Sequence, residues 1–455
     1  MPVFATTIFL SAFLLFLVQP IIAKQILPWF GGAPAVWNTC MVFFQTLLLA
    51  GYAYSDWSTR HLSPRRQAIV HAVLLVVSAL LLPIAADPGW KPTGSEDPVW
   101  RILLLLCATI GLQYFLLSST GPLVQASFVR RFGGAQVYRL FALSNFGSLL
   151  ALLAYPLAIE TLITTHAQVV GWSTAYVFFV LLCAGSMFMA VKAPGAIAEE
   201  HAQTRDAPPG VAQQLLWLCL AAIGTVVLLA ITNHITQNIS SIPLLWLGPL
   251  TLYLLSFILC FEGRGWYWRP LFVPLFVVLV GAMAWGLQTD SGLLELRKAI
   301  PLYLAGLFVA CMFFHGELAR NRPSPHHLTR FYLMISLGGA VGGMLVGLVA
   351  PRLFTGYYEL PLALIAGAAL GAVALWKSVP IGAIASLVAM GVAGYYGYDY
   401  RKDVREDAVL VERNFFGVLR VQDTGEGLDK NRRLVHGTIM HGKQSFDPAH
   451  RREPL

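Results

Sequence analysis

Long apolar runs alternate with short polar connections along most of this chain, and the alternation predicts its fold. A helix that crosses a bilayer needs about 20 largely apolar residues. About thirteen stretches approach that length, near 3–23, 35–55, 68–86, 101–121, 138–158, 169–191, 213–232, 242–261, 270–288, 299–316, 330–351, 359–376 and 379–398. Since lipid offers the backbone no hydrogen-bond partners, such stretches are helices. The pattern predicts an all-α polytopic membrane bundle of about 12–13 transmembrane helices.

The pattern changes beyond residue 400. Residues 401–455 are hydrophilic, with eleven Lys/Arg and nine Asp/Glu. Residues 408–422 are β-prone, 433–441 alternate less cleanly, and a polar turn with Gly425 and Gly427 lies between them. This is typical of a β-hairpin. Because a lone hairpin is marginal in water, we expect it to lead into a domain that these residues do not contain.

Composition agrees with a membrane location. The chain is 57% hydrophobic and 12% charged, whereas soluble domains carry about 25% charged residues. The net charge of +8 fits the Lys/Arg bias of cytoplasmic loops, so we expect a lipid bilayer and no nucleic acid as partner. The cysteines lie in apolar stretches without metal-ligand spacing, which indicates small core residues: Cys40, Cys107, Cys183, Cys219, Cys260 and Cys311.

Basic residues predict the orientation. They gather after the second, fourth and tenth spans, at Arg60, Arg65, Arg66, Arg130, Arg131, Arg139, Arg320, Arg322 and Arg330. The positive-inside rule then places the N-terminus in the cytoplasm, and we expect an inner (cytoplasmic) membrane protein. Thirteen spans would put the tail outside, but Arg401, Lys402 and Arg405 favour the inside. A miscounted or re-entrant helix near 357–398 would resolve this conflict, and the tail's side stays open.

The polar, Pro-containing stretch 193–212 is typical of a linker and predicts halves at 1–192, with six helices, and 213–400, with six or seven, followed by the tail at 401–455. Residues 139–147 (RLFALSNFG) resemble 330–338 (RFYLMISLG), each at the fifth span of its half. Residues 34–37 (PAVW) and 243–246 (PLLW) likewise open the second span of each half. Two halves of one topology are a common transporter plan.

Several segments together resemble one known family. They are 19–24, 27–38, 42–45, 51–54, 243–257, 315–318, 413–421, 436–444 and 452–455. They resemble the membrane portion of spermidine-synthase-like (polyamine aminopropyltransferase-like) fusion proteins, with halves organised as in major facilitators. The resemblance implies that the hairpin enters an aminopropyltransferase-like domain with a methyltransferase-type Rossmann fold. One departure is Gln19, where the family often has an acid.

The catalytic part of that family is missing from these residues. A glycine-rich strand–loop–helix with a downstream acidic ligand and a pair of substrate aspartates are both absent. Gln444 matches a family residue that contacts decarboxylated S-adenosylmethionine, but that cofactor would require the missing domain. We therefore predict no catalytic residue and no cofactor in this chain, and leave enzymatic activity open.

Candidate substrate-path residues lie in the uncharged stretch 232–241 (TNHITQNISS) between two spans. His234, Gln237 and Asn238 could line a vestibule, and the alternative is an ordinary loop. Trp37 and Trp246 each open a span. Such residues usually anchor helices at the membrane interface, and the alternative is an aromatic wall for a cationic substrate.

Other polar and small residues suggest contacts between helices. Asn38, Gln45, Gln113 and Asn145 lie inside apolar spans, where amides usually bond between helices. Gly339, Gly343 and Gly347 recur every four residues, so they share one face that admits close packing, static or sliding.

At the end of the tenth span, Glu317 and Arg320 are spaced to pair on one helical turn, as a gate or as a solvated cluster. His326 and His327 have no nearby acid or cysteine, so we expect no metal site. No Asp or Glu lies in the middle of a span, which disfavours a carrier that neutralises cations within the membrane.

Three hypotheses follow. The first is the membrane module of a spermidine-synthase-like fusion protein that anchors or feeds a separate or absent aminopropyltransferase domain. The second is a stand-alone transporter of a small neutral or amphipathic molecule. The third is a spermidine-synthase relative without a complete active site.

Overall fold

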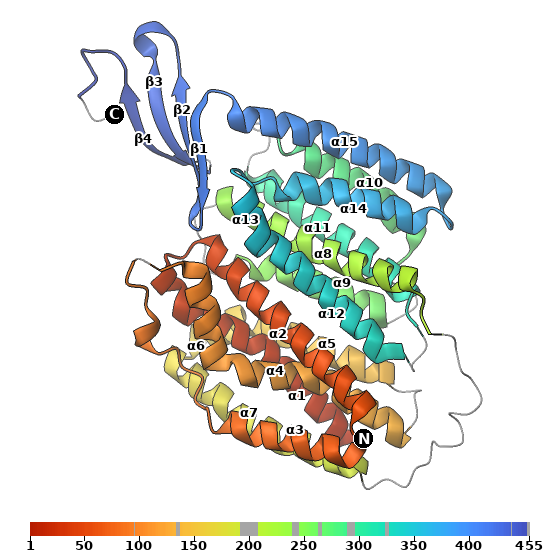
Figure 1. Cartoon of the computed structure of the whole chain (residues 1–455). Helices are drawn as coiled ribbons and strands as arrows, with labels where there is room; N and C mark the ends of the chain where they lie inside the picture. The colour runs from red at the N-terminus through yellow and green to blue at the C-terminus, as the bar shows by residue number, and fades with distance from the viewer. Residues whose placement is uncertain are drawn as a thin grey trace.

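The computed structural model describes residues 1–94, 96–132, 137–191, 208–238, 245–262, 266–288, 296–323, 327–437 and 439–452. Within these ranges, nine helices are long and apolar enough to cross a membrane, and three shorter apolar helices accompany them at 247–261, 269–285 and 359–375. The predicted all-α polytopic membrane bundle is confirmed (Figure 1). Most of the predicted linker, 192–207, lies outside the described residues.

The chain up to Val191 forms one set of helices. They are α1 (Pro2–Ile26), α2 (Pro34–His61), α3 (Pro64–Ala79), α4 (Pro98–Phe132), α5 (Val137–Ala154), α6 (Glu160–Leu162) and α7 (Thr165–Val191). Proline opens α2, α3 and α4, where its missing N–H would have had no intrahelical acceptor. A short 3-10 turn, η1 (Leu27–Phe30), ends α1, and a π-helical turn, η3 (Tyr155–Ile159), joins α5 to α6.

A second set follows from Val211. It comprises α8 (Val211–Asn238), α9 (Leu247–Glu262), α10 (Arg269–Trp285), α11 (Leu296–Arg320), α12 (Leu328–Met344), α13 (Ala350–Leu353), α14 (Glu359–Leu375) and α15 (Pro380–Arg405). A π-helical turn, η6 (Leu345–Val349), joins α12 to α13. The last helix extends past residue 400, where the sequence predicted the tail to begin.

The same packing pairs recur in both sets. In the first, α1 packs on α4, α5 and α7, and α2 packs on α4; in the second, α8 packs on α11, α12 and α14, and α9 packs on α11. Both copies of the fifth helix carry a π-helical turn near their ends. The sets are joined mainly through α2 with α12 and α5 with α9. α15 adds to this scheme by packing on α10 and α14.

A close helix crossing repeats as well. A Cβ on Gly147 of α5 would lie 2.8 Å from the carbonyl oxygen of Phe9 in α1. A Cβ on Gly338 of α12 would lie 2.3 Å from the carbonyl oxygen of Leu218 in α8. These glycines end the two segments that resemble one another in sequence. Only glycine admits so close an approach, so the local likeness reflects one shared packing requirement.

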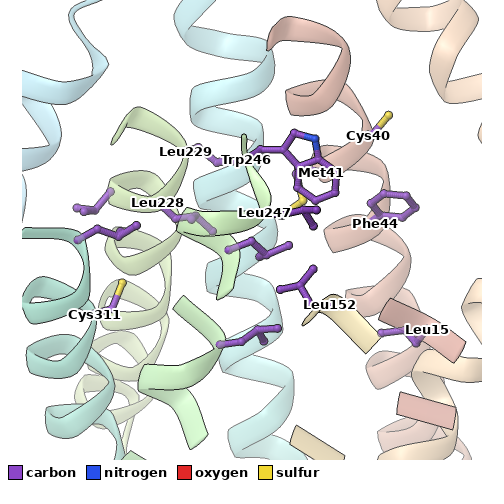
Figure 2. Close-up of a cluster of buried hydrophobic side chains, with 14 of the residues drawn as sticks. Leu15, Cys40, Met41, Phe44, Leu152, Leu228, Leu229, Trp246, Leu247 and Cys311 are labelled. Atoms are coloured by element: carbon purple, nitrogen blue, oxygen red, sulfur yellow. The ribbon is translucent and has the colours of Figure 1, made fainter. Parts of the chain in front are cut away.

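One hydrophobic core cluster contains residues from both sets. Figure 2 shows members of it, with Met41 and Phe44 from α2, and Leu228 and Leu247 from α8 and α9. Four cysteines are buried, as predicted, but Cys107 and Cys219 are exposed on the bundle surface.

The tail forms a four-stranded antiparallel sheet in the order β1-β2-β3-β4. Its strands are β1 (Ala408–Asn414), β2 (Gly417–Thr424), β3 (Asn431–His436) and β4 (Ile439–Ser445). The predicted hairpin corresponds to β2 and β3, joined through Gly425 and Gly427, both at positive φ. The segment 408–422, predicted as one β-prone stretch, turns at Phe415 and Phe416 to make two strands.

The two ends of the chain lie at opposite ends of the bundle (Figure 1). We call the end that contacts the sheet the sheet face; it includes Gly31, against which Phe416 packs, and Glu359, which pairs with Arg413. The end that carries Met1 is the N-terminal face. α14 and α15 are two helices packed side by side. The basic residues after α15 lie at the sheet face, away from Met1. The suggested miscount or re-entrant helix near 357–398 stays a prediction.

Candidate functional site: a central cavity between the two helix sets

A cavity of about 210 Å³ lies in the middle of the bundle. Its walls come from α1, α2, α4 and α5 of the first set and from α8, α9 and α12 of the second. Aromatic side chains supply much of the wall: Phe44, Tyr52, Tyr114, Phe141, Tyr253 and Tyr332. Among the described lining residues, none is Asp, Glu, Lys, Arg or His. The cavity is therefore suited to an uncharged molecule, since a charge there would have no counter-charge.

Three buried polar groups without a protein partner line this cavity. Gln45 Oε1, Asn145 Nδ2 and Ser336 Oγ are buried without a hydrogen-bond partner, and all three residues line it. An unpaired buried polar atom costs free energy, and few native groups remain so. These groups could be satisfied by a bound molecule that both donates and accepts hydrogen bonds.

The cavity is closed toward the sheet face by paired residues from the two sets. The rings of Trp37 in α2 and Trp246 before α9 stack with centroids 3.3 Å apart and planes 17° apart. Both side chains are buried, at 5% and 6% exposure. Next to Trp37, Asn38 donates from Nδ2 to Asn233 Oδ1 of α8 at 2.8 Å. These contacts hold α2 against the second set at this end.

The two tryptophans hold equivalent places in the similar segments 34–37 and 243–246. Their burial shows that the predicted role as interface anchors is wrong. Neither ring offers an open face to a cation at this contact, because the two rings stack on each other. Residues that meet their own counterparts are expected at an axis of two-fold symmetry.

The opposite end of the cavity has a looser boundary. Along α2, Trp37, Met41 and Phe44 are buried, whereas Gln45, Leu48 and Tyr52, nearer the N-terminal face, are partly exposed. An aromatic cluster borders this end, where Phe141 of α5 stacks on Tyr332 of α12 with centroids 5.4 Å apart. The structure is thus sealed toward the sheet face and less tightly closed toward the N-terminal face.

The predicted path residue His234 lies off this route. Its ring meets Tyr303 of α11 edge-on, at 4.5 Å between centroids, within the second set. Asn233, which sequence reasoning missed, is the residue that faces α2. Successive residues of a helix are rotated by about 100°. The sequence therefore identified the correct turn of α8 but chose the neighbouring side chain, which faces another helix. The side chains of Gln237 and Asn238 lie outside the described residues.

The amides predicted inside spans divide into two groups. Asn38 bonds to Asn233, and Gln113 of α4 donates to the Ser78 carbonyl oxygen at 3.1 Å, so both join helices. Gln45 and Asn145 instead line the central cavity. Sequence alone did not separate these groups, because all four occupy similar apolar surroundings along the chain.

Glu317 pairs with a different residue from the one its spacing suggested. Its carboxylate accepts from Arg269 Nε at 2.7 Å and from the Tyr267 hydroxyl at 2.8 Å. The Glu317 side chain is fully buried, whereas Arg320 is exposed. The predicted Glu317–Arg320 pair is replaced because Glu317 points toward α10, which supplies a donor from another helix.

The predicted glycine face lies at a junction between the sets. A Cβ on Gly343 would lie 2.1 Å from Gln45 Oε1, and one on Gly347 would lie 2.7 Å from Val42. Both partners belong to α2, whereas Gly339 lines the cavity. The face therefore serves the α2–α12 contact, in which the two sets meet.

Gln444 lies exposed on β4, opposite Arg432 in the register of β3. The suggested contact with decarboxylated S-adenosylmethionine rested on the family resemblance alone.

No protein-family model and no curated protein matches this chain. Among solved structures it is similar to a D-xylose–proton symporter, at 13% identity and TM-score 0.48, over 85% of this chain and 97% of that one. It is also similar to the human organic anion transporter MFSD10 (TETRAN), at 13% identity and TM-score 0.45, over 88% and 99% of the two chains. For the nucleoside transporter NupG the identity is 14% and the TM-score 0.45, over 89% and 98%.

The predicted resemblance to spermidine-synthase-like fusion proteins is wrong. The similar solved structures are transporters, and no family or curated match connects the chain to aminopropyltransferases. Packing within the chain accounts for Arg413, which lies in one of the resembling segments, and for Gln19, the position that departs from the family. Gln19 Nε2 donates to the Tyr114 hydroxyl at 3.2 Å, and Arg413 pairs with Glu359. The prediction of a polyamine-type substrate rested on this resemblance and is therefore not supported either.

Proposed function

We propose that this protein is a transporter that moves a small uncharged molecule through the central cavity. The observation that carries the proposal is the cavity itself, bordered by both helix sets, uncharged, and supplied with unpaired buried polar groups. The helices at 1–192 and 213–400 would act as two related halves. Their contacts through α2–α12 and α5–α9 would separate alternately at the two faces.

Transport through this cavity requires the two ends to open in turn. The stacked Trp37 and Trp246 and the Asn38–Asn233 bond support the view that the described state is closed at the sheet face. Gly343 of α12 and Gly347 of η6 would let this segment move along α2, since neither glycine has a side chain that interlocks with that helix. A bundle that only anchored another domain in the membrane would need neither an internal polar cavity nor glycines where the two halves meet.

The test is uptake by the purified protein in proteoliposomes. Uncharged solutes such as uridine and D-glucose are compared with their phosphorylated forms, and we expect only uncharged solutes to enter above protein-free vesicles. Asn145→Leu should lower uptake by about tenfold, as expected for one lost hydrogen bond. Thr174→Val, on the exposed side of α7, is the matched control. Equal uptake of charged and uncharged solutes, or none for a broad uncharged panel, would contradict the proposal.

A further inference from the structure

A second cavity, of about 260 Å³, lies at the sheet face. We call it the vestibule. Its lining includes Asn38 of α2, Asn233 of α8 and Gly347 of η6, together with residues 413–416 of the tail. Because Asn38 and Asn233 bond to each other beside the stacked tryptophans, these contacts separate the vestibule from the central cavity.

The tail covers the vestibule with a preformed turn. Asn414 Oδ1 accepts from the backbone N–H groups of Phe416 at 2.9 Å and Gly417 at 3.2 Å. Such a side-chain bond fixes a tight turn. The turn places Phe415 against the bundle core and leaves Phe416 half-exposed above it.

On one side, the turn is attached to the second helix set. Arg413 forms an ion pair with Glu359 at the start of α14, and both side chains are only 5% exposed. Arg413 Nη1 also donates to the Gly356 carbonyl oxygen at 2.9 Å, and the guanidinium lies 4.5 Å from the Tyr357 ring centroid. Removing one member of a buried pair leaves an uncompensated charge, so this attachment is strong.

On its other side, the turn only rests on the first helix set. Phe416 lies against Gly31, where a Cβ would be 3.3 Å from the phenyl ring. Gly31 follows η1 with φ +83°, a conformation that favours glycine. The contact is apolar and half-exposed, so it can separate at little cost when the two sets move apart.

We propose that residues 414–417 are a lid over the sheet-face exit of the transport path. This inference rests on the proposed function. A solute that leaves the central cavity toward the sheet face must pass the tryptophans and enter the vestibule beneath the turn. The Arg413–Glu359 pair keeps the lid on the second set, while the Phe416–Gly31 contact closes it against the first. Opening breaks the second contact and leaves the first intact.

The test measures access to the vestibule and needs no substrate. Thr39, which lines the vestibule, is replaced by cysteine in the full chain. Its labelling rate with a membrane-impermeant maleimide is measured in proteoliposomes, after subtraction of the rate for the six native cysteines. Phe416→Ala should raise the Thr39→Cys labelling rate at least severalfold, and Arg413→Ala should raise it further.

The control is Leu428→Ala, in the exposed connection between β2 and β3, which should leave the rate unchanged. Since Phe416 is half-exposed, its replacement should not impair folding, and an unchanged melting temperature checks this. A labelling rate that Phe416→Ala leaves unchanged would overturn the lid. This result is independent of uptake, so the lid can fail while transport holds, and transport can fail while the lid holds.

Discussion

At the residue scale, Glu317 shows how a buried charge is tolerated in an apolar bundle. It is fully buried on α11 and receives hydrogen bonds from Arg269 and Tyr267. Burying an unpaired carboxylate costs free energy, and the hydrogen bonds from these two donors offset that cost. The pair fixes the start of α10 against the end of α11 near the N-terminal face.

Replacing Glu317 should therefore destabilise the protein. Glu317→Ala leaves Arg269, whose side chain is 18% exposed, without its counter-charge. We expect a loss of about 3–5 kcal/mol, seen as a lower melting temperature in detergent. Arg320→Ala removes an exposed charge three residues along the same helix and should change stability by less than about 0.5 kcal/mol. Equal losses for both variants would show that the pairing is wrong.

At the element scale, α12 presents glycines to two neighbours. Gly338 and Gly342 face the backbone of α8 in the same set, whereas Gly343, together with Gly347 in the following η6, faces α2 in the other set. One helix therefore combines a fixed crossing with a contact between the sets. The shift of face between residues 342 and 343 follows from the 100° advance per residue.

The close contact between α12 and α8 should not accommodate a methyl group at Gly338. In Gly338→Ala the new Cβ would meet the Leu218 carbonyl oxygen at 2.3 Å, so backbone must move. We expect a loss of about 1–3 kcal/mol from overpacking, measured as a lower melting temperature. Gly339→Ala is the neighbouring control, because its Cβ would have its nearest contact at 3.7 Å, with Thr225 Oγ1. A larger loss for Gly339→Ala than for Gly338→Ala would contradict this assignment.

At the scale of the whole molecule, α15 determines where the sheet lies. After α14 the chain is at the N-terminal face, and α15 returns it to the sheet face, where β1 begins (Figure 1). The lid therefore depends on this additional helix. Without it, the sheet would follow α14 at the face that carries Met1.

Reporter fusions test this topology. Alkaline phosphatase, which needs disulfides and so an oxidising compartment, is fused after Ser378, between α14 and α15, or after Leu455. We expect one fusion to be active and the other inactive, whichever way Met1 faces. Equal activity of the two fusions would show that α15 does not cross the membrane.

The sequence by itself determined the membrane bundle, the approximate place of each helix and the β-structure of the tail. These follow from local properties, because about 20 apolar residues in lipid must form a helix and alternating residues with glycine turns form strands. It also indicated the equivalence of 139–147 with 330–338 and of Trp37 with Trp246. Conflicting charge signals left the tail's side undecided, since basic residues bias topology without counting helices.

Only the tertiary structure decided which side chains meet. It paired Asn38 with Asn233, Glu317 with Arg269 and Trp37 with Trp246, partners far apart along the chain. It also brought Gln45, Asn145 and Ser336 to one cavity and placed Phe416 over another. Spacing within one helix fixes which residues share a face. Which neighbour that face meets depends on how all the helices pack, and that is a property of the whole bundle.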